Sequence, residues 1–199
     1  IHIADVSALS DGLRLCITMR DQSFETRLNL VGGFQAYNVL AALALAVETG
    51  SDMTAAFCTL AHLRGVRGRM EHVGGLDNGA QVYVDYAHTP DALNTAITAI
   101  RQHVRNLLHV VFGAGGDRDS GKRPMMGQIA ATHADRVIIT DDNPRHEDPN
   151  TIRRPVLNGC PTADDLGNRE EAIAAAVANL EAGDLLMIAG QGQGTGQIT

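Results

Sequence analysis

Cysteine is scarce in this sequence. Cys16, Cys58 and Cys160 are far apart, odd in number and without a C-x-x-C pair. This spacing argues against a disulfide framework and against a zinc site, and it favours thiols that stay reduced. We therefore expect a cytoplasmic protein.

Long apolar runs and an excess of basic residues are also missing. No apolar run approaches the roughly 18 residues of a membrane-spanning helix, and no secretory signal pattern opens the sequence. Lysine and arginine number 16 against 23 aspartate and glutamate residues, which gives a formal net charge of -7. A broad electrostatic grip on nucleic acid or on an acidic membrane is therefore not expected, and an anionic ligand must be held by a few local residues.

The first third of the chain predicts a hairpin followed by helices. Residues 13–19 and 24–30 are typical strands, and the polar residues 20–23 between them predict a turn. Residues 38–47 predict a buried helix that ends at Gly50, and Ser51 can cap a second helix that reaches about residue 63. The arginine-glycine stretch 64–68 predicts a linker, so we expect one domain segment at 1–68 and another at 69–199. Because the sequence opens on Ile-His-Ile and stops in mid-pattern, we expect a fragment at both ends.

The remaining two thirds alternate between strands and helices. Strand-like runs occupy 69–73, 81–85, 107–112, 136–139 and 184–189. Helices are predicted from Thr89-Pro90, which supply a cap and a first-turn proline, over 124–132, and from the capping box of Asn168 and Glu171. Strands separated by helices in this way predict an α/β fold with a mostly parallel sheet that is covered on both faces.

Four loops follow strands of this sheet and should meet at its carboxyl edge, where α/β proteins bind ligands. They are residues 86–91, 113–124, 140–145 and the glycine-rich stretch from Gly190. In the third loop, Pro144 stiffens the turn and holds Asn143 and Arg145 in place. An ordinary turn with solvated charges is an equally simple interpretation of that loop alone.

The loop 113–124 invites two motif assignments that fail. Arg118 stands where G-x-G-x-x-G needs its third glycine, and Arg123 stands where a P-loop needs Ser or Thr. Arg118 and Arg123 are better suited to pairing with a carboxylate or a single phosphate, and a solvated basic loop is an equally good interpretation of these residues alone.

Three further residues have two interpretations each, one functional and one structural. His88 is either a base or phosphate contact, or an ordinary loop histidine, and the residues alone favour the loop histidine. Asp85 contacts a ribose hydroxyl or simply ends its strand, and Arg69 grips a phosphate or lies at the surface.

Four ordered motifs then carry a family resemblance. They are Gly68-Arg69-Met70-Glu71, Val84-Asp85-Tyr86-Ala87-His88-Thr89-Pro90-Asp91, Phe112-Gly113-Ala114-Gly115-Gly116-Asp117-Arg118-Asp119 with Gly121-Lys122-Arg123-Pro124, and Asp142-Asn143-Pro144-Arg145. Together they closely resemble the Mur ligases, and within them the type that adds meso-diaminopimelate. Residues 33–38 and the alanine-rich helix after them are similar to the end of the central ATPase domain of that family.

The resemblance implies an ATP-dependent amide ligase of peptidoglycan synthesis that joins meso-diaminopimelate to UDP-N-acetylmuramoyl-L-alanyl-D-glutamate through an acyl phosphate. It implies the end of an α/β central domain followed by a Rossmann-like carboxyl-terminal domain. Carried over by position, the ATP-binding residues would be Asn38 at adenine, with Arg69, Asp85 and His88 along the nucleotide. The residues for diaminopimelate would be Arg118, Asn143, Arg145 and Gly190. Mg²⁺ would be shared with residues outside this chain, and the fragment should not catalyse alone because the phosphate-binding loop and the UDP-sugar domain are absent.

The sequence departs from the family pattern in its last loop. The family has Gly-Lys-Gly-His-Glu, whereas this chain has Gly190-Gln191-Gly192-Gln193-Gly194, so the acidic residue for the distal ammonium group is missing. Gln35 also stands where asparagine is commoner. Asn143 and Arg145 should then carry more of the amino-acid selectivity. The rival hypotheses are a lysine-adding or folylpolyglutamate-type ligase, and a non-catalytic module that binds an amino acid or a nucleotide.

Overall fold

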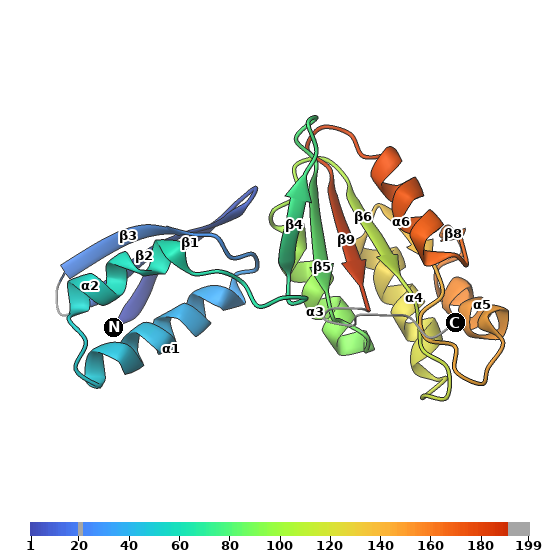
Figure 1. The fold of residues 1–199 in the computed structure, drawn as a ribbon, viewed down its shortest axis with the longest axis horizontal. Coiled ribbons are helices and arrows are strands. Elements are labelled where there is room, and N and C mark those ends of the chain that lie inside the picture. The colour runs from blue at the N-terminus through green and yellow to red at the C-terminus, as the bar shows by residue number, and fades with distance from the viewer. Residues whose placement is uncertain (20–21, 191–199) are drawn as a thin grey trace. The chain divides into compact units, whose positions relative to one another are not determined.

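The computed structural model describes residues 1–19 and 22–190. It divides into two compact units, residues 1–65 and the chain from Val66 onward, and each is described here by itself (Figure 1). The division lies inside the arginine-glycine stretch 64–68. Within the described residues, no helix is both long enough and apolar enough to cross a membrane.

The first unit is a three-stranded antiparallel sheet with helices packed on it. Its elements are β1 (His2–Leu9), β2 (Gly12–Met19), β3 (Gln22–Leu28), α1 (Phe34–Glu48), α2 (Met53–Cys58) and a short 3-10 helix, Leu60–His62. Alternate residues of β2 are fully buried and meet Val39 and Leu43 of α1 in one core. The predicted hairpin of β2 and β3 is confirmed, but β3 already begins at Gln22, inside the predicted turn, while Arg20 and Asp21 lie outside the described residues.

Two predictions in this unit are wrong or incomplete. Asp52, not Ser51, caps α2, because its carboxylate accepts a hydrogen bond from the backbone N–H of Ala55 at 2.8 Å. The strand β1 was not predicted, since only part of its length alternates between exposed and half-buried residues. It pairs with β2 along nearly its whole length, with a bulge between Ile3 and Asp5.

The second unit is built on a six-stranded sheet in the order β4-β5-β9-β6-β7-β8. Its elements are β4 (Glu71–Gly75), β5 (Gln81–Asp85), α3 (Pro90–Arg101), β6 (Leu108–Phe112), α4 (Lys122–His133), β7 (Arg136–Ile139), α5 (Pro149–Gly159), β8 (Asp164–Asp165), α6 (Arg169–Ala178) and β9 (Leu185–Ala189). Only β4 is antiparallel to its neighbour. The predicted mostly parallel α/β sheet is confirmed.

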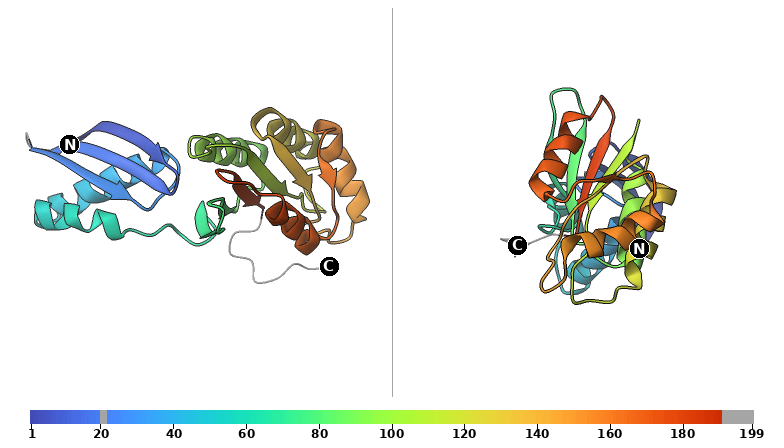
Figure 2. Two further views of the ribbon diagram at one scale, coloured as in Figure 1. Left: turned by 90° about the horizontal axis from the view of Figure 1, so that it is seen from above. Right: turned by 90° about the vertical axis from the view of Figure 1, so that its right-hand side faces the viewer.

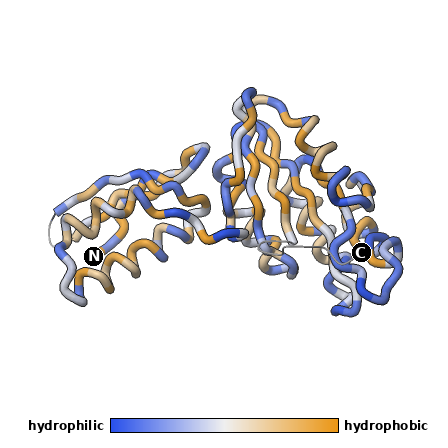
Figure 3. The backbone as a smooth tube through the Cα atoms, viewed as in Figure 1, coloured by the Kyte–Doolittle hydropathy of each residue, from blue (hydrophilic) through white to orange (hydrophobic). Residues whose placement is uncertain are grey.

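Helices cover both faces of this sheet, as expected for parallel strands. Figure 2 shows α3 and α4 on one face and α6 on the other. Ala172 and Ala176 of α6 pack against alternate residues of the strands, including Val111 and Ile188. The central strands β6 and β9 are buried throughout, in keeping with their hydrophobic colouring in Figure 3.

The caps of the helices fix where the loops of this unit begin and end. Thr89 and Asn168 cap α3 and α6 as predicted. Helix α5 was not predicted, although Asp148 caps it and Pro149 occupies its first turn, because Pro155 lies inside it. A proline in a helix interior removes one backbone hydrogen bond and normally predicts a break.

Candidate functional site

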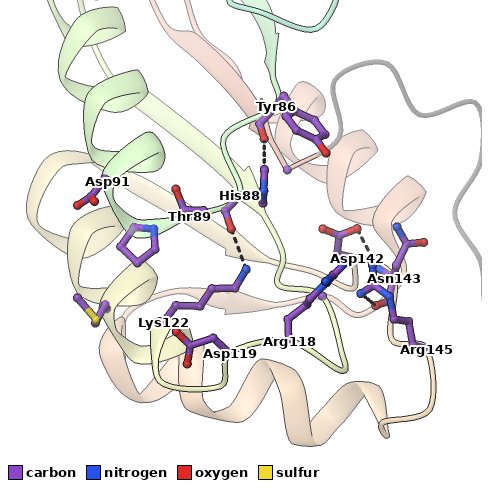
Figure 4. Close-up of a pocket in the computed structure, with 14 residues that line it drawn as sticks. Tyr86, His88, Thr89, Asp91, Arg118, Asp119, Lys122, Asp142, Asn143 and Arg145 are labelled. Atoms are coloured by element: carbon purple, nitrogen blue, oxygen red, sulfur yellow. Dashed lines mark hydrogen bonds between the residues drawn. The ribbon is translucent and has the colours of Figure 1, made fainter.

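A pocket of about 870 Å³ opens at the carboxyl edge of the six-stranded sheet. The loops after β5, β6 and β7 contribute its walls, and Gly190 after β9 completes them. The residues that line it are Tyr86, His88, Thr89, Pro90, Asp91, Gly115, Arg118, Asp119, Lys122, Met125, Asp142, Asn143, Arg145 and Gly190. Five of the eight predicted site residues therefore surround one cavity, namely His88, Arg118, Asn143, Arg145 and Gly190 (Figure 4).

The charges that line this pocket are balanced. Arg118, Lys122 and Arg145 are the cations, and they are matched by the carboxylates Asp91, Asp119 and Asp142. A ligand that carries both carboxylate and ammonium groups would find partners of both signs here. The arrangement suits an amino acid better than it suits a polyanion.

Lys122 connects two walls of the pocket. Its ammonium group donates a hydrogen bond of 2.9 Å to the backbone carbonyl of His88, as Figure 4 shows. Burial lowers the pKa of Lys122, and the neighbouring Arg118 acts in the same direction, while Asp119 and Asp142 oppose the shift. No role was predicted for Lys122 beyond its place in the rejected P-loop match.

The loop after β7 divides between structural contacts and the pocket. Thr140 donates to the carbonyl of Gly167 at 3.0 Å, and Asp141 forms an ion pair with Arg153. Asp142 is only 8% exposed, yet it reaches the pocket and accepts the backbone N–H of Asn143 at 2.8 Å. Sequence reasoning gave Asp142 no role of its own, although it directly precedes Asn143 at the end of a strand.

The two arginines of the pocket differ in the number of hydrogen bonds that they donate to the rest of the protein. Arg145 donates through Nη1 to the carbonyl oxygens of Gly116 at 2.7 Å and of Asn143 at 3.4 Å. Its Nε and Nη2 atoms make no such bond within the described part of the chain. Arg118 is exposed, and among residues 1–19 and 22–190 its guanidinium has no hydrogen-bond or ion-pair partner. Arg118 is therefore the more available anion-binding group.

Arg123 does not line the pocket and is not solvated, so neither of the two interpretations of this loop, a ligand contact or a solvated basic residue, holds for it. Its side chain is 3% exposed and donates to the Glu147 carboxylate at 2.7 Å. The carboxylate that it pairs with is thus internal. From sequence alone, an arginine at the start of α4 could not be distinguished from one that faces a ligand, because Glu147 is 24 residues away.

The residues predicted to lie along a nucleotide are arranged around Tyr86. The Arg69 guanidinium carbon lies 4.5 Å from the centre of the Tyr86 ring, and the His88 ring lies 4.6 Å from it on an edge-to-face contact. Asp85 is 9% exposed, and its two carboxylate oxygens accept the backbone N–H groups of Met70 and Ala87, each at 2.8 Å. Asp85 thus holds the backbone at the end of β5.

Asn38 belongs to the first unit, whereas the pocket belongs to the second. It is exposed on α1, and its amide donates to the side chain of Gln35 at 3.0 Å. The glutamine that replaces the commoner asparagine therefore contacts the predicted adenine residue.

Gly190 forms the last wall of the pocket with φ at +98°, a conformation that favours glycine. Its N–H donates to the carbonyl of Asp85 at 3.1 Å, and a side chain here would approach the Asp142 carboxylate at 3.4 Å. The loop departures at Gln191, Gly192, Gln193 and Gly194 lie outside the described residues. Within the described residues, no group of three or more His, Cys, Asp or Glu side chains could hold a metal ion.

Comparisons with known proteins agree on one family. Residues 68–192 match the family model of the Mur ligase, glutamate ligase domain. The chain is 51% identical over its whole length to the UDP-N-acetylmuramoyl-L-alanyl-D-glutamate--2,6-diaminopimelate ligase of Zymomonas mobilis, and 50% identical to that of Bradyrhizobium diazoefficiens. It spans about 41% of the length of each. A solved structure of a ligase with the same name is 39% identical, with a TM-score of 0.75, over 96% of this chain and 39% of that one.

Proposed function

This chain belongs to the Mur ligase family, and from that premise we propose that it is part of an ATP-dependent ligase that joins meso-diaminopimelate to UDP-N-acetylmuramoyl-L-alanyl-D-glutamate. Residues 1–68 would be the end of the central ATP-binding domain, and residues 69–199 the domain that binds the amino acid. The reaction would take place in the cytoplasm, which the three free cysteines favour.

The observation that carries this proposal is the charge pattern of the pocket. Diaminopimelate has two carboxylate and two amino groups, whereas lysine lacks the distal carboxylate. Arg118 and the unused nitrogens of Arg145 can each take a carboxylate, and planar guanidinium groups suit that geometry. Asp142 offers a carboxylate to an ammonium group of the ligand, and it could take the place of the acidic residue that the family has at position 194 and this chain lacks. If the substrate were lysine, which has one carboxylate, only one of the two arginines would have a carboxylate to bind.

The chemistry assigned to this chain is positioning. The glutamate carboxylate of the nucleotide sugar would accept the terminal phosphoryl group of ATP, and the amine of diaminopimelate would attack the resulting acyl carbon. A C–N bond forms, inorganic phosphate leaves, and the amine loses a proton. The pocket contributes by holding the amine in line, because a fixed orientation removes much of the entropic cost of a bimolecular step.

ATP would lie against the cluster of Arg69, Tyr86 and His88, which combines one cation with two aromatic rings, and Tyr86 and His88 also line the pocket. Asn38 would contact adenine, and Asp85 would support this wall by holding the backbone of Met70 and Ala87. Mg²⁺ assists phosphoryl transfer in such ligases, but the described residues offer no cluster to hold it. Its ligands would come from other parts of the enzyme.

The test is amino-acid selectivity of the full-length enzyme. Initial rates of ligation are measured with meso-diaminopimelate, L-lysine and L-glutamate as the incoming amine, at saturating ATP and nucleotide sugar. We expect kcat/KM for diaminopimelate to exceed that for lysine by at least about 100-fold, because the pairing of one buried or half-buried carboxylate is worth about 2–3 kcal/mol. Preference for lysine or glutamate would support the rival ligases, and absence of any ligation would support the non-catalytic module.

A further inference from the structure

A layer of charged residues behind the pocket joins the two loops that carry Arg118 and Arg145. Glu147 is its centre, because one carboxylate oxygen accepts both the backbone N–H of Asp117 at 2.6 Å and the Nη2 of Arg123 at 2.7 Å. Arg123 is buried at 3% exposure, so this ion pair is anchored on the inner side. The Arg123 guanidinium, together with the Asp117 N–H, keeps the pKa of Glu147 below its usual value.

The contact with Asp117 matters because its backbone is left-handed. Asp117 has φ at +52°, a conformation that costs energy for a residue with a side chain. It is held from two directions, by Glu147 at its N–H and by the His146 ring at its carboxylate, 2.6 Å away. Arg118 follows directly, so the turn at Asp117 sets the direction in which Arg118 leaves the loop.

Arg145 is held by the same pair of loops. It too is left-handed, with φ at +54°, and it donates to the carbonyl of Gly116 at 2.7 Å. The N–H of Gly116 in turn donates to the carbonyl of Asn143 at 2.9 Å. A Cβ at Gly116 would collide with the carbonyl oxygen of Pro144, so the two loops approach too closely for any other residue. The loops therefore form one unit, in which the two pocket arginines have a fixed relation.

We propose that Glu147, anchored by Arg123, is a positioning residue that fixes Arg118 relative to Arg145 and so selects an amino acid with two carboxylates. A fixed separation of two guanidinium groups benefits a ligand that engages both of them. It gives no advantage to a ligand with one carboxylate, which needs only one arginine. This inference rests on the proposed function, because it assumes that the pocket binds diaminopimelate.

Glu147 is tested by graded substitution in the full-length enzyme. Glu147→Gln keeps an acceptor for the Asp117 N–H but loses the charge that pairs with Arg123, and Glu147→Ala loses both. We expect the KM for diaminopimelate to rise about threefold for Gln and about tenfold or more for Ala, because the lost hydrogen bonds do not touch the ligand and only part of their free energy is transmitted to binding. The KM for ATP should stay within about twofold, since hydrogen bonds at the nucleotide wall are unchanged. The matched control is Glu170→Ala, which removes an exposed glutamate of α6 and should change neither KM.

The selectivity readout separates positioning from a general loss of structure. If Glu147 fixes the spacing of the arginines, Glu147→Ala lowers kcat/KM for diaminopimelate much more than the weak kcat/KM for lysine. An equal loss with both amino acids, or an equal rise in the KM for ATP, would overturn the proposal and indicate a merely structural role.

A double variant tests the route through Asp117. Because Asp117→Gly also removes the contact with His146, the effect of Glu147→Ala is measured both with and without Asp117→Gly. Glycine adopts positive φ without steric cost, so Glu147→Ala should raise the KM for diaminopimelate less in the Asp117→Gly background than in the unsubstituted enzyme. An equal rise in both backgrounds would show that Glu147 does not act through this turn.

The proposed function is contradicted if the unsubstituted enzyme does not prefer diaminopimelate. The role of Glu147 is contradicted if Glu147→Ala lowers kcat/KM for diaminopimelate and for lysine by the same factor. The two failures are therefore distinguishable.

Discussion

The two edges of the six-stranded sheet both carry buried carboxylates, but they use them differently. At the amino edge, where the parallel strands begin, Asp184 is 2% exposed and accepts four hydrogen bonds. At the carboxyl edge, Asp142 is 8% exposed, and it reaches the pocket beside Arg118. The buried carboxylate at the first edge is enclosed by donors of the chain, whereas the second edge also presents the guanidinium of Arg118, which has no hydrogen-bond or ion-pair partner among residues 1–19 and 22–190.

The network at the amino edge explains why Asp184 is structural. Its donors are the backbone N–H groups of Glu181 at 2.8 Å and Leu107 at 3.0 Å, the Asn106 amide at 2.8 Å and the His109 ring at 3.0 Å. Burial works to raise the pKa of Asp184, but these hydrogen bonds lower it on balance. A smaller cavity of about 380 Å³ lies beside it, yet the carboxylate has its acceptor sites filled already.

The difference between the two edges separates charged residues that stabilise the fold from charged residues that can bind a ligand. A carboxylate whose acceptor sites are filled by backbone N–H groups ties strands together, and its loss affects stability. A cation that has no partner in the described part of the chain, such as Arg118, makes no hydrogen bond or ion pair there whose loss would destabilise the fold. Burial alone does not separate the two classes, because Asp142 and Asp184 are both buried. Five predictions test this distinction, and they follow in order of decreasing effect.

The largest effect is expected for Asp184→Ala. Removal of this carboxylate leaves four donors without their partner at the start of β6 and β9, and breaking such a buried network typically costs about 3–5 kcal/mol of unfolding free energy. Thermal or urea unfolding of the full-length protein measures the loss. Asp164→Ala is the matched control, because Asp164 is an exposed aspartate in β8, at the edge of the same sheet. An equal effect for both substitutions would contradict the assignment of Asp184 as structural.

The pH dependence of the same site follows from the sign of its pKa shift. A carboxyl group whose pKa is lower in the folded than in the unfolded state stabilises the fold above its unfolded pKa of about 3.9, and this contribution disappears as the pH falls through the folded pKa. The stability difference between the unsubstituted protein and Asp184→Asn should therefore be full near neutral pH and shrink in acid.

Arg118→Ala should give the largest effect on binding. Its guanidinium has no partner within the described residues, so its substitution should raise the KM for diaminopimelate about 10- to 100-fold, the equivalent of about 1.5–3 kcal/mol for hydrogen bonds to a charged group. The unfolding temperature and the KM for ATP should not change. Arg154→Ala, which removes an exposed arginine of α5, serves as control. A large loss of stability in the Arg118 variant would place it in the same class as Asp184.

Arg145→Ala should have a smaller but more complex effect. One nitrogen of Arg145 already binds Gly116 and Asn143, so its loss both removes a ligand contact and loosens the loop. We expect the KM for diaminopimelate to rise about tenfold, corresponding to about 1.4 kcal/mol, with a much smaller effect on the KM for ATP. Arg145→Lys separates the two contributions, because it keeps the charge and loses the planar fork. Equal effects on both substrates would show that Arg145 does not bind the amino acid.

Local patterns in the sequence predicted much of the second unit. Thr89-Pro90 and Asn168 mark the starts of α3 and α6 because capping chemistry acts over three or four residues. The meeting of His88, Arg118, Asn143 and Arg145 at one pocket followed from the rule that parallel strands share a carboxyl edge. These predictions succeed because their physical causes are local or belong to the fold as a whole.

The failures have a different origin, in contacts between distant residues. Arg123 was interpreted as either a ligand contact or a solvated loop residue, but it is buried and its partner Glu147 comes from the loop after β7. Helix α5 contains Pro155, and local propensity does not reveal that α4 packs closely against it, with Gly127 against the backbone of Val156. Pairing partners of this kind are set by tertiary packing, which a single sequence does not display.

The smallest predicted effect concerns Asp148, which directly follows Glu147 but has a structural role at the start of α5. Its carboxylate caps α5 by accepting the N–H groups of Asn150 at 2.9 Å and Thr151 at 3.2 Å. Asp148→Ala should therefore lower the unfolding free energy by about 1 kcal/mol, the usual worth of such a cap, and Asp148→Ser should restore most of it. Asp148 is exposed and does not line the pocket, so its substitution removes no ligand contact. The KM for diaminopimelate should therefore stay within about twofold. If Asp148→Ala raised the KM for diaminopimelate as much as Glu147→Ala does, the residues that position the pocket arginines would include the start of α5. A carboxylate that accepts hydrogen bonds from the backbone would then not be purely structural at this edge of the sheet.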